Sequence, residues 1–497
     1  MRIAWLVLLG LASAMAVNAQ SAAYGDRSHT PESGLRFESS DARLTEAFNW
    51  AKAQALRSAH DGDSNGNKGA AGPWYEAALP GRDAFCMRDV AHQTWGAAAL
   101  GLDAQNRNML GRFAAAVAPD RDWAGYWEID KQGRPSDADY VSDADFWYNL
   151  PANFDVLDSI VRMWRWTGDE SYVNDASMQR FFKATGDEYV KAWQLEPDAI
   201  LKRPRIMNKR LPKGKFVASR GIPSYSEGEV GFNLGTDLLA AEYRGFEGLA
   251  SIAKHNHDAG EAARYAKTAN AILELVEHRA WSEKEQHFMG FFSQDGETHG
   301  ASMHGSGDAM VLYFGATHDP VHIRAALKRI ESAEYLKGIG IEEESYLAQT
   351  FYHYGETEAA YERIMDLTRT DKERREYPEV SYSVIGALVT GVMGVDVVEK
   401  DIVSLARLRG KTETAKVSGL RVRGQVVDVE HVGDARSALT NHSNKTVRWR
   451  AEFTGRAAML TVDGKTMRAE SSLDAMQMPV SWVVVEVPAG KTVVVSR

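Results

Sequence analysis

The connections between the predicted helices alternate between short and long along most of this chain. Apolar residues recur at helical spacing in twelve segments of the 497-residue sequence. The expected helices are residues 43–59, 88–101, 105–117, 152–167, 170–193, 234–254, 258–280, 304–315, 319–332, 343–354, 356–369 and 380–393. A short turn follows most even-numbered helices, whereas the connections before them span roughly ten to forty residues, and the longest loops of this kind are usually functional. This alternation predicts six helical hairpins with their long loops at one end, which is an (α/α)6 barrel.

The polarity of the helices predicts the same arrangement independently. The even-numbered helices are apolar almost all round, as in 96–101 and 384–395, and a helix of this kind is buried on every side. The odd-numbered helices are amphipathic, as in 258–280, where Tyr265 and Ile272 lie on an apolar stripe. We therefore expect the even helices to form an inner ring and the odd helices an outer ring. The long loops then surround the end at which the inner helices begin, which we call the mouth.

The hydrophobic pattern changes its period near residue 398. From there to the last residue, apolar and polar residues alternate with period two, and Asp463-Gly464 and Ala489-Gly490 mark hairpin turns. This predicts a C-terminal antiparallel β-sandwich. The expected domains are a signal peptide (1–19), a leader segment (20–42), the barrel (43–397) and the β-sandwich (398–497).

The first residues indicate export from the cell. Arg2, the apolar run 3–11 and Val17-Asn18-Ala19 form a secretory signal that is too short to anchor the chain in a bilayer. Cys86 is the only cysteine, which excludes intrachain disulfides and fits a bacterial periplasm or culture medium. The net charge of −10 argues against nucleic acid as a partner. We expect a periplasmic or secreted protein that does not insert into a membrane after the signal is removed.

The long loops carry clusters of acids, arginines and aromatic residues. Rings beside a few charged groups are typical of a ligand pocket, and in sugar sites the rings stack on sugar faces while the charges hold hydroxyls. For each acid at the start of a helix, capping or a favourable interaction with the helix dipole is the structural alternative. The spacing of the histidines and Asp308 before the eighth helix matches no standard zinc motif, so we assign no metal ligand. The candidate substrate-binding residues are Arg82, Arg88, Asp89, His92, Asp143, Asp145, Trp147, Tyr148, His304, Glu343 and Tyr382.

Carboxylates on opposite sides of the mouth are the candidate catalytic groups. Glycoside hydrolysis uses one acid to protonate the leaving oxygen and a second carboxylate to activate water or attack directly. Glu227 and Glu229 precede the sixth helix and Glu379 lies at the start of the twelfth, half a ring away. Residues two apart in an extended stretch point in opposite directions, so we expect only one of Glu227 and Glu229 to face the pocket. Capping of the helix by Ser226 or Glu227 is the alternative, and the placement of the acids on opposite sides of the mouth favours an inverting enzyme.

Several phrases of the chain resemble the six-hairpin glycosidase superfamily, which includes glucoamylase-like and bacterial α-L-rhamnosidase-like catalytic domains. These phrases are GRDAFCMRD before the second helix, YNLPANFD at the fourth and YPEVSYSVIGALVTGVMGV at the twelfth. The resemblance covers residues 43–396 at the level of architecture. In glucoamylase-like members the acid lies in the loop before the sixth helix and the base at the start of the twelfth. The resemblance therefore implies Glu227 or Glu229 as the acid and Glu379 as the base, although the Trp-Glu-Glu signature of that acid is missing here.

A polar segment near residue 61 matches part of a calcium-binding loop. Asp61, Asp63 and Asn65 stand at ligand positions, but position twelve is Gly72 and not the bidentate Glu. We predict a flexible polar loop, with calcium binding as the alternative, and no other cofactor.

These features together predict an exo-acting glycoside hydrolase on polysaccharide-derived oligosaccharides, because a mouth ringed by loops holds a chain end. Arg82 and Arg88 favour an acidic sugar such as a uronate at the cleaved end, with the deoxy sugar rhamnose as an alternative. A second hypothesis is a polysaccharide lyase, in which Tyr225, His92 or Tyr382 abstracts a proton next to a uronate carboxylate. A third is a carbohydrate-binding barrel without catalysis.

Overall fold

In the computed structural model, six helices of the described part of the chain form a closed inner ring. The structure describes residues 31–62, 70–77, 79–203, 216, 219–226, 232–293, 297–300 and 307–497. Each inner helix contacts the next one along the chain, and the last contacts the first. The inner helices are α3 (Met87–Ala99), α5 (Pro151–Thr167), α9 (Thr236–His255), α11 (Asp308–Tyr313), α14 (Ile341–His353) and α16 (Pro378–Gly386), which continues as η6 (Ala387–Val392).

The outer layer is formed by the helices that alternate with these along the chain. It consists of α2 (Ala42–Arg57), α4 (Asp103–Ala116), the consecutive segments α6 (Ser171–Asn174), α7 (Ala176–Lys183), η2 (Ala184–Tyr189) and α8 (Val190–Ala192), α10 (Ala259–Leu275) with η5 (Val276–Ala280), α12 (Pro320–Glu331) and α15 (Thr357–Thr368). The predicted (α/α)6 barrel and its helix order are confirmed, and the helix ends differ from prediction by a few residues. One short helix, α13 (Ala333–Gly338), lies in the connection before α14 and was not predicted.

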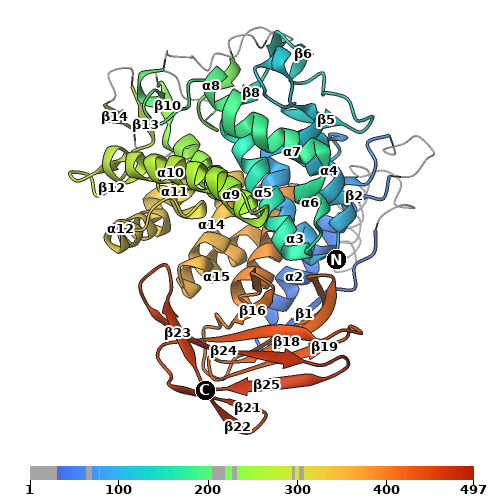
Figure 1. Ribbon diagram of the computed structural model, residues 1–497. Coiled ribbons are helices and arrows are strands. Elements are labelled where there is room, and N and C mark those ends of the chain that lie inside the picture. The colour runs from blue at the N-terminus through green and yellow to red at the C-terminus, as the bar shows by residue number, and fades with distance from the viewer. Residues whose placement is uncertain are drawn as a thin grey trace, which may run out of the picture.

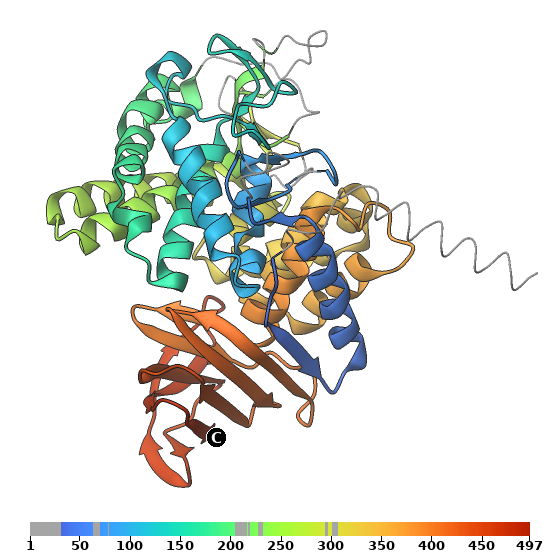
Figure 2. The ribbon, with the colours of Figure 1, turned by 90° about the vertical axis from the view of Figure 1, so that its right-hand side faces the viewer.

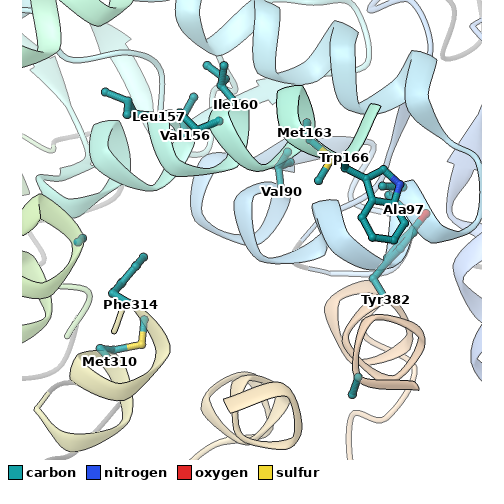
Figure 3. Close-up of a cluster of buried hydrophobic side chains, with 14 of the residues drawn as sticks. Val90, Ala97, Val156, Leu157, Ile160, Met163, Trp166, Met310, Phe314 and Tyr382 are labelled. Atoms are coloured by element: carbon teal, nitrogen blue, oxygen red, sulfur yellow. The ribbon is translucent and has the colours of Figure 1, made fainter. Parts of the chain in front are cut away.

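Burial separates the two helical layers as the sequence pattern predicts. Every residue of α16 is buried, whereas α10 buries only the stripe Tyr265, Ala269 and Ile272. Figure 3 shows side chains of α3, α5 and α16, together with Met310 and Phe314, in the apolar core. The ring closes tightly between α3 and α16, since a Cβ atom added at Gly96 would overlap the backbone carbonyl of Tyr382. Only glycine permits this approach of the two helices.

The connections into the inner helices fold into small sheets at one end of the barrel. Their strands are β2 (Ala59–His60), β3 (Trp74–Tyr75), β4 (Ala84–Cys86), β5 (Glu128–Asp130), β6 (Tyr140–Ser142), β7 (Asp145–Phe146), β8 (Tyr148–Asn149), β9 (Arg220–Ile222), β10 (Leu234–Gly235), β11 (Trp281–Ser282), β12 (His287–Phe288), β13 (Phe291–Phe292) and β14 (Thr298–His299). Short turns η1 (Pro119–Arg121) and η3 (Ile200–Lys202) lie in the same loops. Strand β8 pairs parallel with β9, which joins the second and third long loops.

The C-terminal region contains two larger sheets. One has the order β1-β17-β18-β19-β25-β21-β22 and the other the order β15-β16-β20-β24-β23. Residues alternate between buried and accessible along β18 and β20, which is the period of a strand with one face in a core. The strands are β1 (Arg36–Ser39), β15 (Asp396–Val398), β16 (Asp401–Leu405), β17 (Thr414–Val422), β18 (Gln425–Val432), β19 (Arg436–Asn441), β20 (Val447–Thr454), β21 (Met459–Val462), β22 (Lys465–Arg468), β23 (Glu470–Leu473), β24 (Pro479–Val487) and β25 (Thr492–Ser496).

A strand from the leader segment belongs to this C-terminal region. β1 pairs antiparallel with β17, with Phe37 opposite Val417, and Phe37 also packs on Phe48 of α2 at a ring-centre distance of 5.7 Å. Residues from the two ends of the chain therefore form one sheet.

The C-terminal sheets and the mouth lie at opposite ends of the barrel. Figures 1 and 2 show the red strands below the helices, and in Figure 1 strands β6, β8, β10 and β14 of the long loops lie near the upper end. Strands β15 and β17 contact α5, and β17 also contacts α3. We call this end the base of the barrel. Among the described helices, none is long and apolar enough to cross a bilayer.

Candidate active site

Arg88 brings three of the long loops together at the mouth. It lies in the first turn of α3, and its Nε lies 3.3 Å from a carboxylate oxygen of its neighbour Asp89, which is 4% exposed. The guanidinium carbon lies 5.4 Å from the ring centre of Tyr225 and 6.0 Å from that of Trp127. These distances are those of cation–π contacts. The loops before α5 and α9 thus meet the start of α3, where the first long loop ends, at one cation with two aromatic walls.

Asp237 fixes the loop that leads into α9. It is the second residue of that helix and is fully buried. Its carboxylate accepts hydrogen bonds from the backbone N of Tyr225 at 2.6 Å and from the hydroxyl of Ser224 at 3.0 Å. Burial raises the pKa of Asp237 to about 7, with the hydrogen bond from Ser224, backbone hydrogen bonds at the helix start and the charge of Arg88 acting in the opposite direction. The group therefore titrates near neutral pH and holds Tyr225 against Arg88.

Asp155 is a second buried carboxyl group near the mouth. It lies in α5, is 5% exposed, and has no hydrogen-bond partner among the described residues. Burial and the nearby Asp158 raise the pKa of Asp155 well above its usual range, against the charges of Arg162 and Arg88. A carboxyl group with a raised pKa in a pocket is a candidate for acid–base work or for contact with a ligand hydroxyl.

A layer of rings lies below these charged groups. His92 stacks on Tyr346 with ring centres 3.7 Å apart and planes 12° apart, and Tyr313 meets both rings edge-on. Nε2 of His92 lies 3.0 Å from the hydroxyl of Ser345. Burial, together with two nearby arginines, lowers the pKa of His92 to about 3. His92 is therefore neutral at physiological pH, and its low basicity argues against a role in proton abstraction.

Glu379 lies at the junction between the last and the first inner helix. It is the second residue of α16 and is 2% exposed. The side-chain amide of Gln93 links the two helices when it is oriented to satisfy both of its ends. In that orientation its oxygen accepts from the backbone N of Glu379 at 3.0 Å, and its nitrogen donates to the carbonyl of Asp89 at 3.3 Å. Glu379 and Asp89 are thus fixed at the starts of adjacent helices.

Tyr382 has its hydroxyl directed to the outer helix α2. The residue is completely buried, its hydroxyl donates to the carbonyl of Ala55 at 3.0 Å, and its ring packs on Tyr75 at 4.8 Å. These contacts join α16 to the outer helix α2.

Arg82 is held by two acids of the next long loop. Its guanidinium lies 2.8 Å from Glu128 and 3.3 Å from Asp139. Burial raises the pKa of Glu128, while Arg82 acts to lower it. The pairs join the first and second long loops and occupy the face of Arg82 that would bind a carboxylate.

The acids Asp143 and Asp145 make contacts within the loop framework. Asp143 pairs with the buried Arg121 and accepts a 2.8 Å hydrogen bond from the hydroxyl of Tyr140. Asp145 accepts from the backbone N of Phe216. Asp143 thus connects segments within the second long loop, and Asp145 connects the second long loop to the third.

The aromatic residues that follow these acids are buried. Trp147 is 5% exposed, and its backbone N donates to the carbonyl of Asp139 at 2.8 Å. Tyr148 is completely buried, and its hydroxyl donates to Asn153 and contacts the sulfur of Met87 at 3.3 Å. The rings therefore pack beneath the loops, and Trp127 and Tyr225 are the rings that flank Arg88.

The acids at the start of α14 bind protein groups. The carboxylate of Glu343 accepts a 2.7 Å hydrogen bond from the backbone N of Gly340 and so caps the helix. Glu344 points to the outer layer, where it pairs with Arg363 at 2.8 Å and with Lys372. Helix capping, which is the structural alternative for acids at a helix start, therefore describes Glu343, and pairing with basic residues describes Glu344.

Some predicted site residues lie outside the described residues. They are Glu227, Glu229, His304, Asp63 and Asn65. Asp61 is described, and its carboxylate accepts a 3.4 Å hydrogen bond from Gln105. Asp308 is buried and lies 3.2 Å from Arg329 of α12, so it serves the contact between α11 and α12. Across the part of the chain that the structure describes, no three His, Cys, Asp or Glu side chains come close enough to hold a metal ion.

Sequence reasoning missed Asp155, Asp237 and Trp127 as mouth residues. The signal was present for both acids, since a charged residue on an apolar inner helix must face a polar interior or carry a partner. Trp127 had no comparable signal, because a tryptophan in a long loop is equally compatible with the core.

Comparisons with solved structures show which fold this is. An α-L-rhamnosidase from Dictyoglumus thermophilum matches with a TM-score of 0.60 and 14% identity over 94% of this chain and 51% of its own. An α-L-rhamnosidase from Aspergillus terreus matches with a TM-score of 0.55 and 14% identity over 92% of this chain and 50% of its own. A putative kojibiose phosphorylase from the human microbiome matches with a TM-score of 0.56 and 8% identity over 92% of this chain and 63% of its own.

The chain spans about half the length of the two rhamnosidases it matches. No protein-family model and no curated protein matches the sequence. The structural similarity shows that the chain has the fold of the six-hairpin glycosidases, as the resemblance of its sequence phrases implied.

Proposed function

We propose that this protein, with its six-hairpin glycosidase fold, is a secreted or periplasmic glycoside hydrolase that acts at the mouth of the barrel. One observation carries the proposal. Buried carboxyl groups lie near the starts of several inner helices, namely Asp89, Asp155, Asp237 and Glu379, and these helices all begin at the mouth. Burying acids is costly unless they have partners or a function. Asp89, Asp155 and Asp237 lie near Arg88 and its two aromatic walls, and Glu379 lies at the start of the adjacent helix, an arrangement that suits a sugar ligand.

Glu379 is the proposed general base. As base it would take a proton from water while that water attacks the anomeric carbon and the bond to the leaving oxygen breaks. The general acid, which gives its proton to the leaving oxygen, is proposed to be Glu227 or Glu229. Both glutamates follow Tyr225 closely in the sequence, and the ring of Tyr225 contacts Arg88, which supports this choice.

Arg88 is the proposed ligand for the sugar at the cleaved end. Arg82 already binds Glu128 and Asp139, whereas the ring contacts of Arg88 bring it to the centre of the mouth. A guanidinium there would bind the carboxylate of a uronate or the hydroxyls of a neutral sugar such as rhamnose. The surrounding loops favour a chain end, so we propose exo-acting cleavage of polysaccharide-derived oligosaccharides.

The test is a screen of aryl glycosides and oligosaccharides with analysis of the products, followed by Glu379→Gln with the best substrate. We expect kcat to fall by at least about a thousandfold, because the base activates the nucleophile. The matched control is Glu373→Gln, an exposed acid in the same loop. Near-normal hydrolysis by Glu379→Gln would refute Glu379 as base. Parallel Glu227→Gln and Glu229→Gln variants identify the general acid. Replacing the general acid should lower kcat strongly on substrates with poor leaving groups and only slightly on substrates with good leaving groups.

A polysaccharide lyase is the second candidate, and one observation favours it. The buried hydroxyl of Tyr225 has no hydrogen-bond partner among the described residues, and its ring lies beside Arg88. In β-elimination Arg88 would neutralise the uronate carboxylate while Tyr225, as the phenolate, takes the proton from the carbon next to it. The bond from the β-carbon to the glycosidic oxygen then breaks, a double bond forms between the two carbons, and the leaving oxygen takes up a proton from Tyr225 or from water. The new double bond of the product absorbs ultraviolet light, so absorbance during the same screen separates lyase from hydrolase. Binding without any turnover would instead support a carbohydrate-binding barrel.

A further inference from the structure

A cavity of about 210 Å³ lies inside the barrel near its base, away from the mouth. Residues near the C-terminal ends of α3, α11 and α14 line it, together with Asp396 of β15, the first strand of the C-terminal region. Its lining includes Trp95, Arg244, Tyr313, Gln349, His353 and Asp396. His353 and Asp396 are exposed, which places an opening between the barrel and β15.

Tyr313 separates this cavity from the candidate active site. It lines the cavity, and its ring lies edge-on at 5.9 Å from His92 and 4.9 Å from Tyr346. The stacked pair of His92 and Tyr346 belongs to the layer below Arg88. The rings therefore form a partition between the mouth and the base, so the cavity is a site of its own.

One wall of the cavity is a rigid framework of fully used charges. One carboxylate oxygen of Asp158 accepts a 2.8 Å hydrogen bond from Nε of Arg162. The other oxygen accepts a 2.9 Å hydrogen bond from Nε of Arg244. The remaining nitrogens of Arg162 donate to Thr94, Ser159 and the carbonyl of Ala91. Asp158 and Arg162 therefore orient Arg244 and have little left to offer a ligand.

Other lining groups keep unused hydrogen-bonding capacity. Within the described chain, no hydrogen bond uses the terminal nitrogens of Arg244, the indole N–H of Trp95, the hydroxyl of Tyr313 or the imidazole of His353. Gln349 donates to Thr390 at 3.0 Å, and its carbonyl oxygen is left over. Asp396 accepts from the backbone N of Val397 on one oxygen only. The lining of the cavity thus combines donors, acceptors and two aromatic rings.

We propose that this cavity binds a neutral polyol of the size of one monosaccharide. The charges of the lining cancel, since Arg162 and Arg244 face Asp158 and Asp396. A ligand with many hydroxyls uses donors and acceptors together, and the rings of Trp95 and Tyr313 can cover its apolar face. The cavity volume corresponds to about seven water molecules at roughly 30 Å³ each. It is smaller than the roughly 300 Å³ of the smallest pockets that bind drug-sized ligands, so it suits a single monosaccharide. This proposal does not depend on the chemistry at the mouth.

The test measures binding to the full-length mature protein by calorimetry and ligand-observed NMR. The probes are glucose, galactose, mannose, xylose and rhamnose, with galacturonate and gluconate as anionic comparisons. A ligand of about twelve non-hydrogen atoms should bind with a Kd of about a millimolar. Two variants each change one lining residue. Asp396→Asn removes a charge and keeps the shape of the cavity, and Trp95→Phe removes the indole N–H and part of the aromatic wall. Glu399→Gln is the matched control, because it is exposed and lies three residues from Asp396 on the turn after β15.

We expect a neutral sugar to bind. Each cavity variant should raise the Kd of that sugar at least tenfold, while Glu399→Gln leaves the Kd unchanged. Hydrolysis at the mouth is measured in parallel and should persist in Asp396→Asn. A lack of sugar binding in the cavity can then be distinguished from a lack of hydrolase activity at the mouth. Three results would overturn the proposal. They are the absence of binding up to 50-fold above the expected Kd, binding that both cavity variants leave intact, and binding restricted to the sugar acids.

Discussion

The carboxylate of Asp237 accepts a 2.6 Å hydrogen bond from the backbone N of Tyr225. The helix start therefore holds the loop whose tyrosine ring lies on Arg88. A helix N-terminus favours a negative charge, so α9 itself stabilises the carboxylate that positions this loop. Asp237 acts through Tyr225 and is a positioning residue.

Replacing Asp237 with Ala should disorder the loop before α9 and lower turnover. The backbone N of Tyr225 and the hydroxyl of Ser224 would lose their acceptor in a buried place, which costs about 1–3 kcal/mol of unfolding free energy. We expect kcat/KM to fall about tenfold or more, while Asp237→Asn, which keeps an acceptor oxygen, recovers much of it. Steady-state kinetics and urea unfolding check this. Equal losses in both variants would contradict a positioning role.

The raised pKa of Asp237 predicts a pH dependence of stability. With a folded pKa of about 7 against an ordinary value of 3.8 for an aspartic acid, the folded state binds the proton more tightly between these values. The unfolding free energy contributed by this group therefore falls as pH rises from about 4 to about 7 and is level above that. Asp308, with a pKa of about 7 from burial, contributes in the same direction. Urea midpoints across this range should decline less steeply in Asp237→Asn, whereas the exposed Asp137→Asn keeps the wild-type slope.

Gly96→Ala should prevent tight closure of the barrel. The added methyl group would overlap the carbonyl of Tyr382 and push α3 and α16 apart. Overpacking of this kind costs roughly 1–3 kcal/mol and occasionally more. Gly338→Ala is the matched control, since a Cβ atom there meets nothing within 4 Å. Chemical denaturation of both variants checks the difference, and equal midpoints would show that the closure relaxes freely.

Arg88→Lys should impair activity without removing the charge. Lysine lacks the planar guanidinium that faces Trp127 and Tyr225 and that binds a ligand through two parallel hydrogen bonds. We expect KM to rise about tenfold with a smaller change in kcat, because the contact positions the sugar. The exposed Arg134→Lys serves as control. An unchanged KM would place the sugar away from Arg88.

The helical part of the fold follows from local patterns, which is why it could be predicted from the sequence. Helices such as α5 and α10 differ in polarity because one is surrounded by protein and the other has a face in water. The alternation of short and long loops then indicates which ends of the helices lie together at the mouth. The pairing of β1 with β17 was not predictable in this way, because the strands are far apart along the chain and share no local signal.

The candidate site was predictable only in part, for a related reason. The sequence marks Arg88, Asp89 and Glu379 as polar residues at the starts of inner helices. It does not show that Arg82 is occupied by Glu128 and Asp139, because those partners come from another loop. Burial, and hence the raised pKa of Asp155 and Asp237, depends on what packs above each group.

The sequence by itself determined the number of helical hairpins, the inner and outer layers and the end at which the long loops lie, because periodicity and chain length are local properties. Only the tertiary structure decided which charged groups pair with each other, which rings flank Arg88, and that a polar cavity remains at the base. These outcomes depend on distances between residues remote in the chain, and hydrogen bonds, ion pairs and burial act only over such short distances.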